Sequence, residues 1–228
     1  MLFLLKSRLE MQRKYILPLF LVFQIIFLKI IAFFPKAVER FYSNGMYIWI
    51  SKISRISLGK IPFSVGDVFY GIVILYTVIF IWKTRKNWKS HWKDNFLKMT
   101  SFISIAYFLF HILWGLNYYR QPLFEKMNIK RDYTNEDLFA FTEKLIAKTN
   151  EVHYTITKNK KLIVTNPYSQ NAIFKMSQNG YANLSQQYLF FQYQTPSIKK
   201  SLISLPLTYM GFGGYLNPFT NEAQMNDK

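Results

Sequence analysis

Three long apolar stretches dominate the hydrophobic pattern of the chain, at about residues 15–34, 65–82 and 99–119. At a rise of about 1.5 Å per residue, a helix of about 20 residues spans the hydrocarbon layer of a membrane. The pattern therefore predicts three transmembrane helices, which make residues 1–120 a membrane anchor.

The first stretch has an alternative interpretation as a cleaved signal peptide. Such a peptide has an apolar core of only about 7–15 residues and small residues at its cleavage site. The run from Tyr15 to Phe34 is longer, and Ala32-Phe33-Phe34-Pro35 is a poor cleavage sequence. The pattern favours a retained anchor.

An amphipathic segment lies between the first two apolar stretches. The apolar residues of its one helical face are Met46, Trp49, Ile50, Ile53 and Ile56, and basic residues lie off this face. This pattern is typical of an interfacial helix that lies flat on the membrane. A helix packed on the soluble half of the protein would show the same stripe, and both interpretations stay open.

The second half of the chain, residues 121–228, has the pattern of water-soluble protein. Thr134 and Asp137 have capping-box spacing and begin a helix that we expect to end near Val152. The β-branched residues of the following segment, residues 153–165, predict a β-hairpin around a polar turn.

Two further helical stretches are predicted in this half, beginning at Asn166-Pro167 and at Thr195-Pro196. Residues 215–226 read as extended chain with a Pro-containing turn, at most an edge strand. The predicted fold class is mainly α: three transmembrane helices and an interfacial helix, followed by a helical α+β region.

The distribution of basic residues sets the orientation. The segment before the first span and the loop of residues 83–98 carry ten Lys and Arg together, whereas the loop of residues 36–63 carries five. Because basic residues accumulate on the cytoplasmic side, the N-terminus is predicted to be cytoplasmic and residues 121–228 extracytoplasmic.

Composition excludes several classes of protein. A net charge of +17 is typical of nucleic-acid-binding proteins, but most basic residues of the first 98 flank apolar runs, and no zinc finger or RNP-type signature is present. The chain has no cysteine, which excludes disulfides, Cys-type zinc sites and thiol catalysis. The expected partners are the lipid bilayer and a protein or peptide, with no nucleic acid.

Three polar residues are predicted to share the outer membrane level. Asp67 begins the second span, and Asn117 and Arg120 end the third. An isolated charge is costly at this depth, so we expect Asp67 to pair with Arg120 or to share a polar network with Asn117. A structural alternative for Asp67 is a capping box with Ser64.

Four short motifs follow one another along the chain: Pro62-Phe63-Ser64-x-Gly66-Asp67, Trp114-Gly115-Leu116-Asn117-Tyr118-Tyr119-Arg120, Lys200-Ser201-x-x-Ser204 and Gly214-Tyr215-x-x-Pro218-Phe219-Thr220-x-Glu222-Ala223-x-x-Asn226. In this order they resemble the N-terminal part of the bacterial membrane family DUF3810, a domain of unknown function. The chain departs from this family in one motif, because the family usually has Gly before the Glu-Ala pair where this chain has Asn221.

The resemblance implies a zinc peptidase in the bacterial cytoplasmic (inner) membrane. In the family an HExxH helix follows the last motif, with two His on one face to bind Zn²⁺ and a Glu as general base. The given sequence stops at Lys228 before such a helix, and His91, His111 and His153 lack the HxxxH spacing. We therefore expect an incomplete outer region, no zinc or catalytic residue within residues 1–228, and no activity of this portion alone.

The same analogy assigns candidate roles to three residues. Tyr215, Glu222 and Asn226 would line a substrate groove beside the absent catalytic helix, or Glu222 would orient a zinc ligand. The alternative for Glu222 is an exposed carboxylate in a turn. We also expect roughly the last 20 residues to be poorly ordered, because their packing partner is missing.

A non-catalytic membrane scaffold that binds a partner protein or an envelope component is the alternative function. It requires no metal and fits the chain as it stands.

Overall fold

The computed structural model describes residues 2–187 and 197–226. The chain divides into two compact units, one formed by residues 1–120 with 192–228 and the other by residues 121–191. The C-terminal segment belongs to the same unit as residues 1–120.

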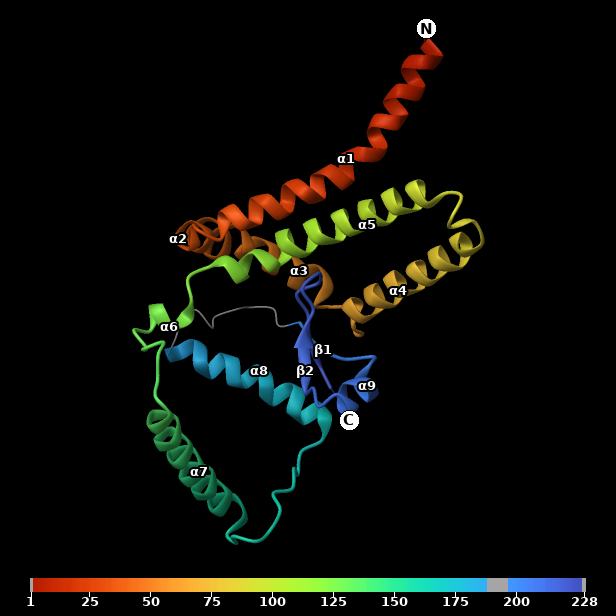
Figure 1. The fold of residues 1–228 in the computed structure, drawn as a ribbon. Helices are drawn as coiled ribbons and strands as arrows, with labels where there is room; N and C mark the ends of the chain where they lie inside the picture. Colours follow the sequence, from red (N-terminus) through yellow and green to blue (C-terminus); the bar gives the residue numbers. More distant parts are fainter. Residues whose placement is uncertain (1, 188–196, 227–228) are drawn as a thin grey trace. The chain divides into compact units, whose positions relative to one another are not determined.

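Three helices of the first unit are long and apolar enough to cross a membrane, as the hydrophobic pattern predicted (Figure 1). They are α1 (Leu2–Ile31), α4 (Val65–Thr84) and α5 (Trp92–Leu113), and the short 3-10 helix η2 (Arg85–Asn87) joins the last two. The third helix begins and ends earlier than its apolar pattern indicated. It stops at Leu113, and the 3-10 helix η3 (Gly115–Tyr119) follows.

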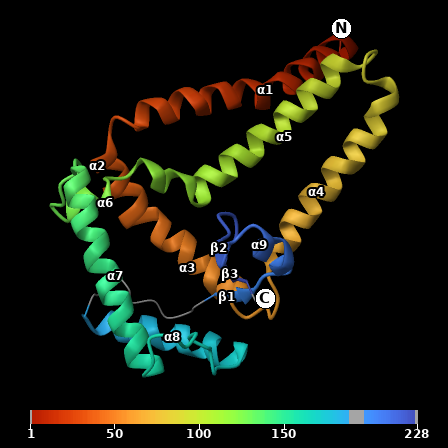
Figure 2. The same cartoon turned by 60° about the horizontal axis from the view of Figure 1, so that its bottom comes forward.

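Helices α1 and α5 lie side by side (Figures 1 and 2). Between them, the buried amide of Gln24 donates hydrogen bonds to Oγ of Ser104 at 3.1 Å and to its carbonyl oxygen at 3.3 Å. The rings of Phe20 and Phe108 pack 5.6 Å apart. Polar pairs of this kind hold helices together in a bilayer, where water does not compete for the hydrogen bond.

A continuous helical segment connects α1 to α4. It comprises α2 (Pro35–Ala37), the π-helix η1 (Val38–Met46) and α3 (Tyr47–Leu58). Figure 2 shows α3 running from the end of α2 toward the start of α4. The hydroxyl of Tyr42 in η1 donates to the carbonyl oxygens of His111 and Ile112, which lie at the C-terminal end of α5 and have no partner within the helix.

The C-terminal segment forms a small mixed sheet with the order β1-β3-β2. Its strands are β1 (Ile198–Lys200), β2 (Gly214–Leu216) and β3 (Ala223–Met225), with α9 (Ser204–Tyr209) between the first two. β3 runs parallel to β1 and antiparallel to β2. These strands correct two predictions: residues 198–200 are a strand where a helix was expected, and β3 is the central strand of the sheet and not an edge. Thr195-Pro196 lie outside the described residues.

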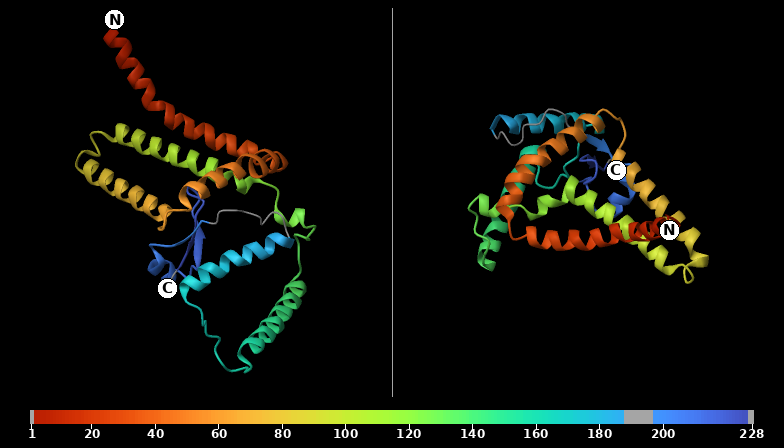
Figure 3. Two further views of the ribbon diagram at one scale, coloured as in Figure 1. Left: turned by 180° about the vertical axis from the view of Figure 1, so that it is seen from behind. Right: turned by 90° about the horizontal axis from the view of Figure 1, so that it is seen from above.

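The expectation that the C-terminal residues lack a packing partner is also wrong for the β2–β3 hairpin. The side chains of Asn217, Glu222 and Gln224 are among the most completely buried in the described chain. The physical reason is that this segment finds its packing partner in the anchor, at the start of α4 (Figure 3).

The second unit contains α6 (Leu123–Lys126), α7 (Asn135–Thr157) and α8 (Gln170–Gln187). The predicted capping box of Thr134 and Asp137 is present. The predicted hairpin is wrong, because α7 continues through its first residues and ends at Lys158 in the left-handed conformation, with φ 55°. The β-branched Thr155 and Thr157 fit this helix because their hydroxyls donate to carbonyl oxygens one turn earlier.

Candidate functional site

Three of the four sequence motifs meet at the N-terminus of α4. Two buried carboxylates make the connections: Glu222 reaches from the β2–β3 turn to the start of the helix, and Asp67 reaches from the helix to the C-terminal segment. We call this group the α4 clasp; it consists of Ser64, Gly66, Asp67, Lys199, Ser201, Tyr215, Glu222 and Gln224.

Glu222 caps the helix from outside its own element. Its side chain is 0% exposed, and its oxygens accept hydrogen bonds from the backbone N–H groups of Gly66 at 2.7 Å and Val65 at 3.4 Å. The hydroxyl of Thr220 donates to the same carboxylate at 3.0 Å. A negative charge is favourable here because the free N–H groups and the dipole make the helix N-terminus positive.

Lys199 supplies a positive charge beside the Glu222 carboxylate. Its Nζ lies 3.9 Å from Oε1 of Glu222 and donates to the carbonyl oxygens of Leu58 at 3.0 Å and of Ile61. Burial lowers the pKa of the Lys199 amine, and the charge of Glu222 opposes this shift. The pair therefore neutralises two charges that would each be costly to bury alone.

Asp67 uses its carboxylate to hold the chain after β1. Oδ2 accepts from the backbone N–H of Leu202 at 2.7 Å and from the hydroxyl of Ser201 at 3.0 Å, and the phenol of Tyr215 donates to Oδ1. Burial, with a smaller effect from Asp67, raises the pKa of the Tyr215 phenol, which therefore stays a neutral donor at physiological pH.

The predicted capping box at the start of α4 is half formed. The hydroxyl oxygen of Ser64 accepts from the backbone N–H of Asp67 at 3.0 Å, as expected, and also from the amide of Gln224 at 2.7 Å. The carboxylate of Asp67 does not return to Ser64, because it is bound by the C-terminal segment. Ser64 and Glu222 together satisfy the first N–H groups of the helix.

Two backbone positions allow the close approach of the clasp. A Cβ on Gly66 would lie 2.4 Å from Nδ2 of Asn217 and 2.5 Å from Nε2 of Gln224, so glycine alone fits without displacement. Asn221 has φ 55°, a left-handed conformation that glycine and asparagine adopt most easily. Asparagine therefore suits this turn, where the family resemblance implies glycine, and its Oδ1 also accepts from the hydroxyl of Tyr47 at 2.6 Å.

The turn between β2 and β3 also inserts an aromatic ring beside the membrane-length helices. The ring of Phe219 lies 5.1 Å from that of Phe69, 6.2 Å from Tyr70 and 6.3 Å from Phe110. These contacts add apolar packing to the polar clasp.

The structure brings only some of the predicted site residues together. Tyr215 and Glu222 both join Asp67 in the clasp, whereas Asn226 donates to Oγ1 of Thr208 and to the carbonyl of Phe212, away from the carboxylates. Glu222 is not the exposed turn carboxylate of the alternative interpretation.

The other two residues of the predicted outer network lie elsewhere. Asn117 accepts from the hydroxyl of Ser43 in η1 at 2.8 Å and donates to the carbonyl of Trp114. In the part of the chain that the structure describes, the Asp67 carboxylate is bound by Ser201, Leu202 and Tyr215 and not by Arg120.

Sequence reasoning missed Lys199 and Gln224. A buried lysine in a three-residue strand has no periodic signal, and a glutamine in an extended run does not indicate a helix-capping partner 160 residues earlier. Gly66, two residues after the N-cap Ser64, is a local signal that could have indicated a close approach to the start of α4.

The described residues do not fit the zinc ion that the family resemblance implies. His91 precedes α5 and His111 lies near its other end, about 30 Å away at 1.5 Å per residue. His153 belongs to the second unit. Within residues 2–187 and 197–226, no group of three His, Asp or Glu side chains could hold a metal. We therefore assign no catalytic step to a metal held by these residues.

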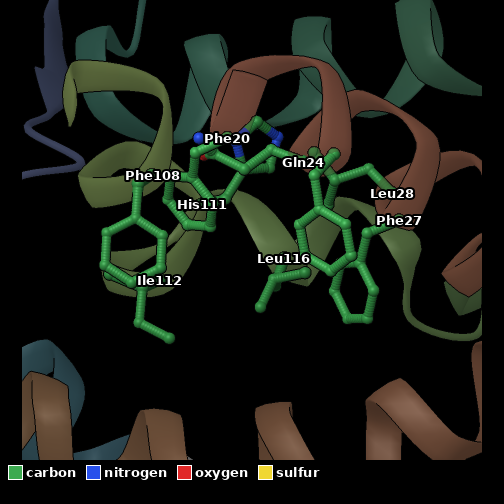
Figure 4. A pocket seen from close by; sticks show the side chains of 9 residues that line it. Phe20, Gln24, Phe27, Leu28, Phe108, His111, Ile112 and Leu116 are labelled. Carbon is green, nitrogen blue, oxygen red and sulfur yellow. The ribbon is translucent and has the colours of Figure 1, made fainter. Parts of the chain in front are cut away.

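A pocket of about 190 Å³ lies between α1 and α5 (Figure 4). Its lining is apolar apart from Gln24 and His111, and no acidic residue lines it. The Gln24 amide is engaged by Ser104, and Nδ1 of His111 donates to the carbonyl oxygen of Tyr107 within α5. The mainly apolar lining therefore suits a hydrocarbon group.

The fold and the site define a mainly helical protein with three candidate membrane-spanning helices, whose C-terminal sheet is bound to the start of the second. Such helices indicate a membrane location. A family described as "Protein of unknown function (DUF3810)" matches residues 42–228, and the chain therefore belongs to this family. This confirms the resemblance indicated by the four motifs. No curated protein and no solved structure matches the chain.

Proposed function

We propose that residues 1–228 are the membrane anchor and front portion of an extracytoplasmic zinc-dependent peptidase, whose catalytic helix lies outside these residues. The family resemblance suggests the activity, and the basic residues flanking the spans support the orientation. The observation that supports the proposal best is the α4 clasp, which fixes the β2–β3 hairpin to a membrane-length helix.

A peptidase at a membrane surface needs a rigid wall that holds an extended substrate beside the reacting groups. The β2–β3 hairpin has the form of such a wall, because an extended peptide can pair with the free edge of a strand. β2 pairs with β3 on one side, and no described strand pairs with its other side. Substrate would lie along this edge of β2, beside Tyr215.

The clasp suggests a positioning role for the carboxylates. Glu222 is fully buried and its oxygens are occupied by backbone amides, and Asp67 is held by three donors. Their proposed contribution is to keep the hairpin in place relative to α4. Neither is proposed to touch the scissile bond.

The test compares residues 1–228 with the entire protein product of the gene, each purified in detergent. Zinc content is measured by atomic absorption, and cleavage is measured with a library of quenched fluorescent peptides. The expected result is stoichiometric zinc and chelator-sensitive cleavage for the entire product, and neither for residues 1–228. An entire product that binds no stoichiometric zinc and cleaves no peptide would overturn the proposal.

A non-catalytic membrane scaffold is the second candidate function. The exposed apolar face of α7, with Leu138, Phe141, Leu145 and Val152, favours it, because such a face suits a protein partner. A photo-crosslinking residue at position 141 would test it in cells. One dominant crosslinked partner, together with absence of zinc and cleavage, would favour the scaffold, and no crosslink would argue against it.

A further inference from the structure

Most of the apolar stripe predicted between Met46 and Ile56 is exposed in the described protein, whereas Ile50 is half-buried. Three large side chains on one face of α3 are strongly exposed: Trp49 is 65%, Ile53 63% and Ile56 48% accessible. Lys52 flanks this face, with its amine 5.6 Å from the ring centre of Trp49. We call these four residues the outer face of α3.

The opposite face of α3 is already occupied by the C-terminal segment. Tyr47 donates to Asn221, the carbonyl of Leu58 accepts from Lys199, and Ser51 is buried. The C-terminal segment therefore packs on the face of α3 opposite Trp49, Ile53 and Ile56, and these three side chains stay outside this contact.

The position of α3 in the chain restricts what can cover the outer face. α1 ends at Ile31 and α4 begins at Val65, so the segment that connects two consecutive membrane crossings must lie at one membrane surface. Figure 2 shows α3 bridging these two helix ends. Phe63, two residues before α4, is a further exposed aromatic residue in this connecting segment.

The composition of the outer face matches the boundary between headgroups and hydrocarbon. Tryptophan is enriched at this depth because its ring is apolar and its N–H is polar. Isoleucines can enter the hydrocarbon, and lysine extends its charged end to the phosphate groups. A water-exposed helix has no reason to place Trp49, Ile53 and Ile56 side by side.

We propose that the outer face of α3 lies in the lipid bilayer at the headgroup boundary, so that α3 is a fourth, interfacial membrane contact. Lys52 reaches the lipid phosphates, while Trp49, Ile53 and Ile56 contact the upper part of the acyl chains. The helix thereby couples the membrane surface to the C-terminal segment packed on its other face.

The absence of cysteine makes this proposal testable by single-cysteine spin labelling of the whole chain. Ile53→Cys is labelled with a nitroxide, and the protein is reconstituted into bilayers of phosphatidylethanolamine and phosphatidylglycerol. Collisions with oxygen, which concentrates in hydrocarbon, are compared with collisions with a water-soluble nickel complex. Matched labels at Ile74 on α4 and Lys144 on α7 give the bilayer and water references, because both side chains are exposed.

The expected result is that oxygen collisions exceed nickel collisions at position 53, with a ratio between the two references. A ratio equal to that of Lys144 would overturn the proposal by placing the face in water. Low collision rates with both reagents would also overturn it, because they would show cover by protein, such as a second copy of the chain. If the Ile53 variant does not fold, Ile56→Cys gives the same reading on the same face.

Discussion

Gly66→Ala tests the clasp with the smallest perturbation that the chain allows. The new Cβ would meet Nδ2 of Asn217 at 2.4 Å and Nε2 of Gln224 at 2.5 Å, and both side chains are fully buried. Relief of this overlap must shift these two side chains, and Asn217 holds the turn before Glu222 by accepting from the N–H groups of Phe219 and Thr220. We therefore expect the 2.7 Å hydrogen bond from the Gly66 N–H to Glu222 to weaken.

The magnitude follows from three contributions. Overpacking of a buried site costs about 1–3 kcal/mol. A hydrogen bond to a charged group contributes about 1.5–3 kcal/mol, and replacing glycine by alanine in a helix returns up to about 1 kcal/mol. We expect the clasp to lose about 2–4 kcal/mol, which corresponds to a fall of about 30- to 900-fold in its closing equilibrium.

The assay is hydrogen exchange of the amides in residues 214–226 and at the start of α4, measured by mass spectrometry in detergent. Gly71→Ala is the matched control, because it lies in the same helix with nothing within 4 Å of the new Cβ. Its exchange should match the unchanged protein or be slightly slower. Equal exchange in the Gly66→Ala and Gly71→Ala variants would refute the reasoning.

Three other substitutions test separate contacts by denaturant unfolding in detergent. Glu222→Gln should lower the free energy of unfolding by about 3 kcal/mol because it leaves the buried amine of Lys199 without its counter-charge; unchanged stability would contradict the ion pair, and adding Lys199→Met should restore part of the loss. Tyr215→Phe should cost about 1.5–3 kcal/mol. Because burial raises the pKa of Tyr215 above its ordinary 10.0, the phenol's contribution is complete below pH 10.0 and declines as the pH rises above it. The stability difference between the unchanged protein and Tyr215→Phe should therefore shrink at alkaline pH, and a constant difference would contradict this. Gln24→Leu should cost only about 0.6–1.7 kcal/mol, because it removes one interhelical contact to Ser104 inside the membrane-length helices; a loss above about 3 kcal/mol would show a larger role.

The parts of the fold that depend on local pattern could be predicted from the sequence. Runs of about 20 apolar residues are unambiguous, so the existence and order of the three membrane-length helices were expected, although the third begins and ends earlier than its apolar run. The N-cap at Ser64 and the capping box at Thr134 were equally local, since each needs only two residues three positions apart.

The C-terminal sheet could not be predicted in the same way. Its strands have three residues each, too few for a recognisable alternation, and β1 pairs with β3 across an intervening helix and hairpin strand. The hairpin predicted at residues 153–165 failed for the opposite reason. Clustered β-branched residues indicated strands, but threonine hydroxyls bonded to the preceding helical turn support the end of α7.

Only the part of the clasp that lies at the start of α4, Ser64 and Asp67, could be predicted from the sequence. Asp67 was expected to need a partner at its membrane level, but the level alone suggested Arg120 on the third span. Nothing in the sequence shows that Ser201 and Tyr215, more than 130 residues later, return to this helix. Tertiary contacts between distant polar residues leave no periodic signal in the sequence. The burial of Glu222 and Lys199 is therefore visible only in the structure.

The most direct test of the clasp is the distance between the N-terminal end of α4 and the β2–β3 hairpin in a lipid bilayer. Spin labels at Lys60→Cys and Leu216→Cys, both exposed positions, allow this distance to be measured by double electron–electron resonance in the cysteine-free chain. We predict one short, narrow distribution of distances between the two labels, which broadens when Gly66→Ala is added. A broad distribution in the unchanged protein would contradict the claim that the clasp fixes the C-terminal segment to the second span.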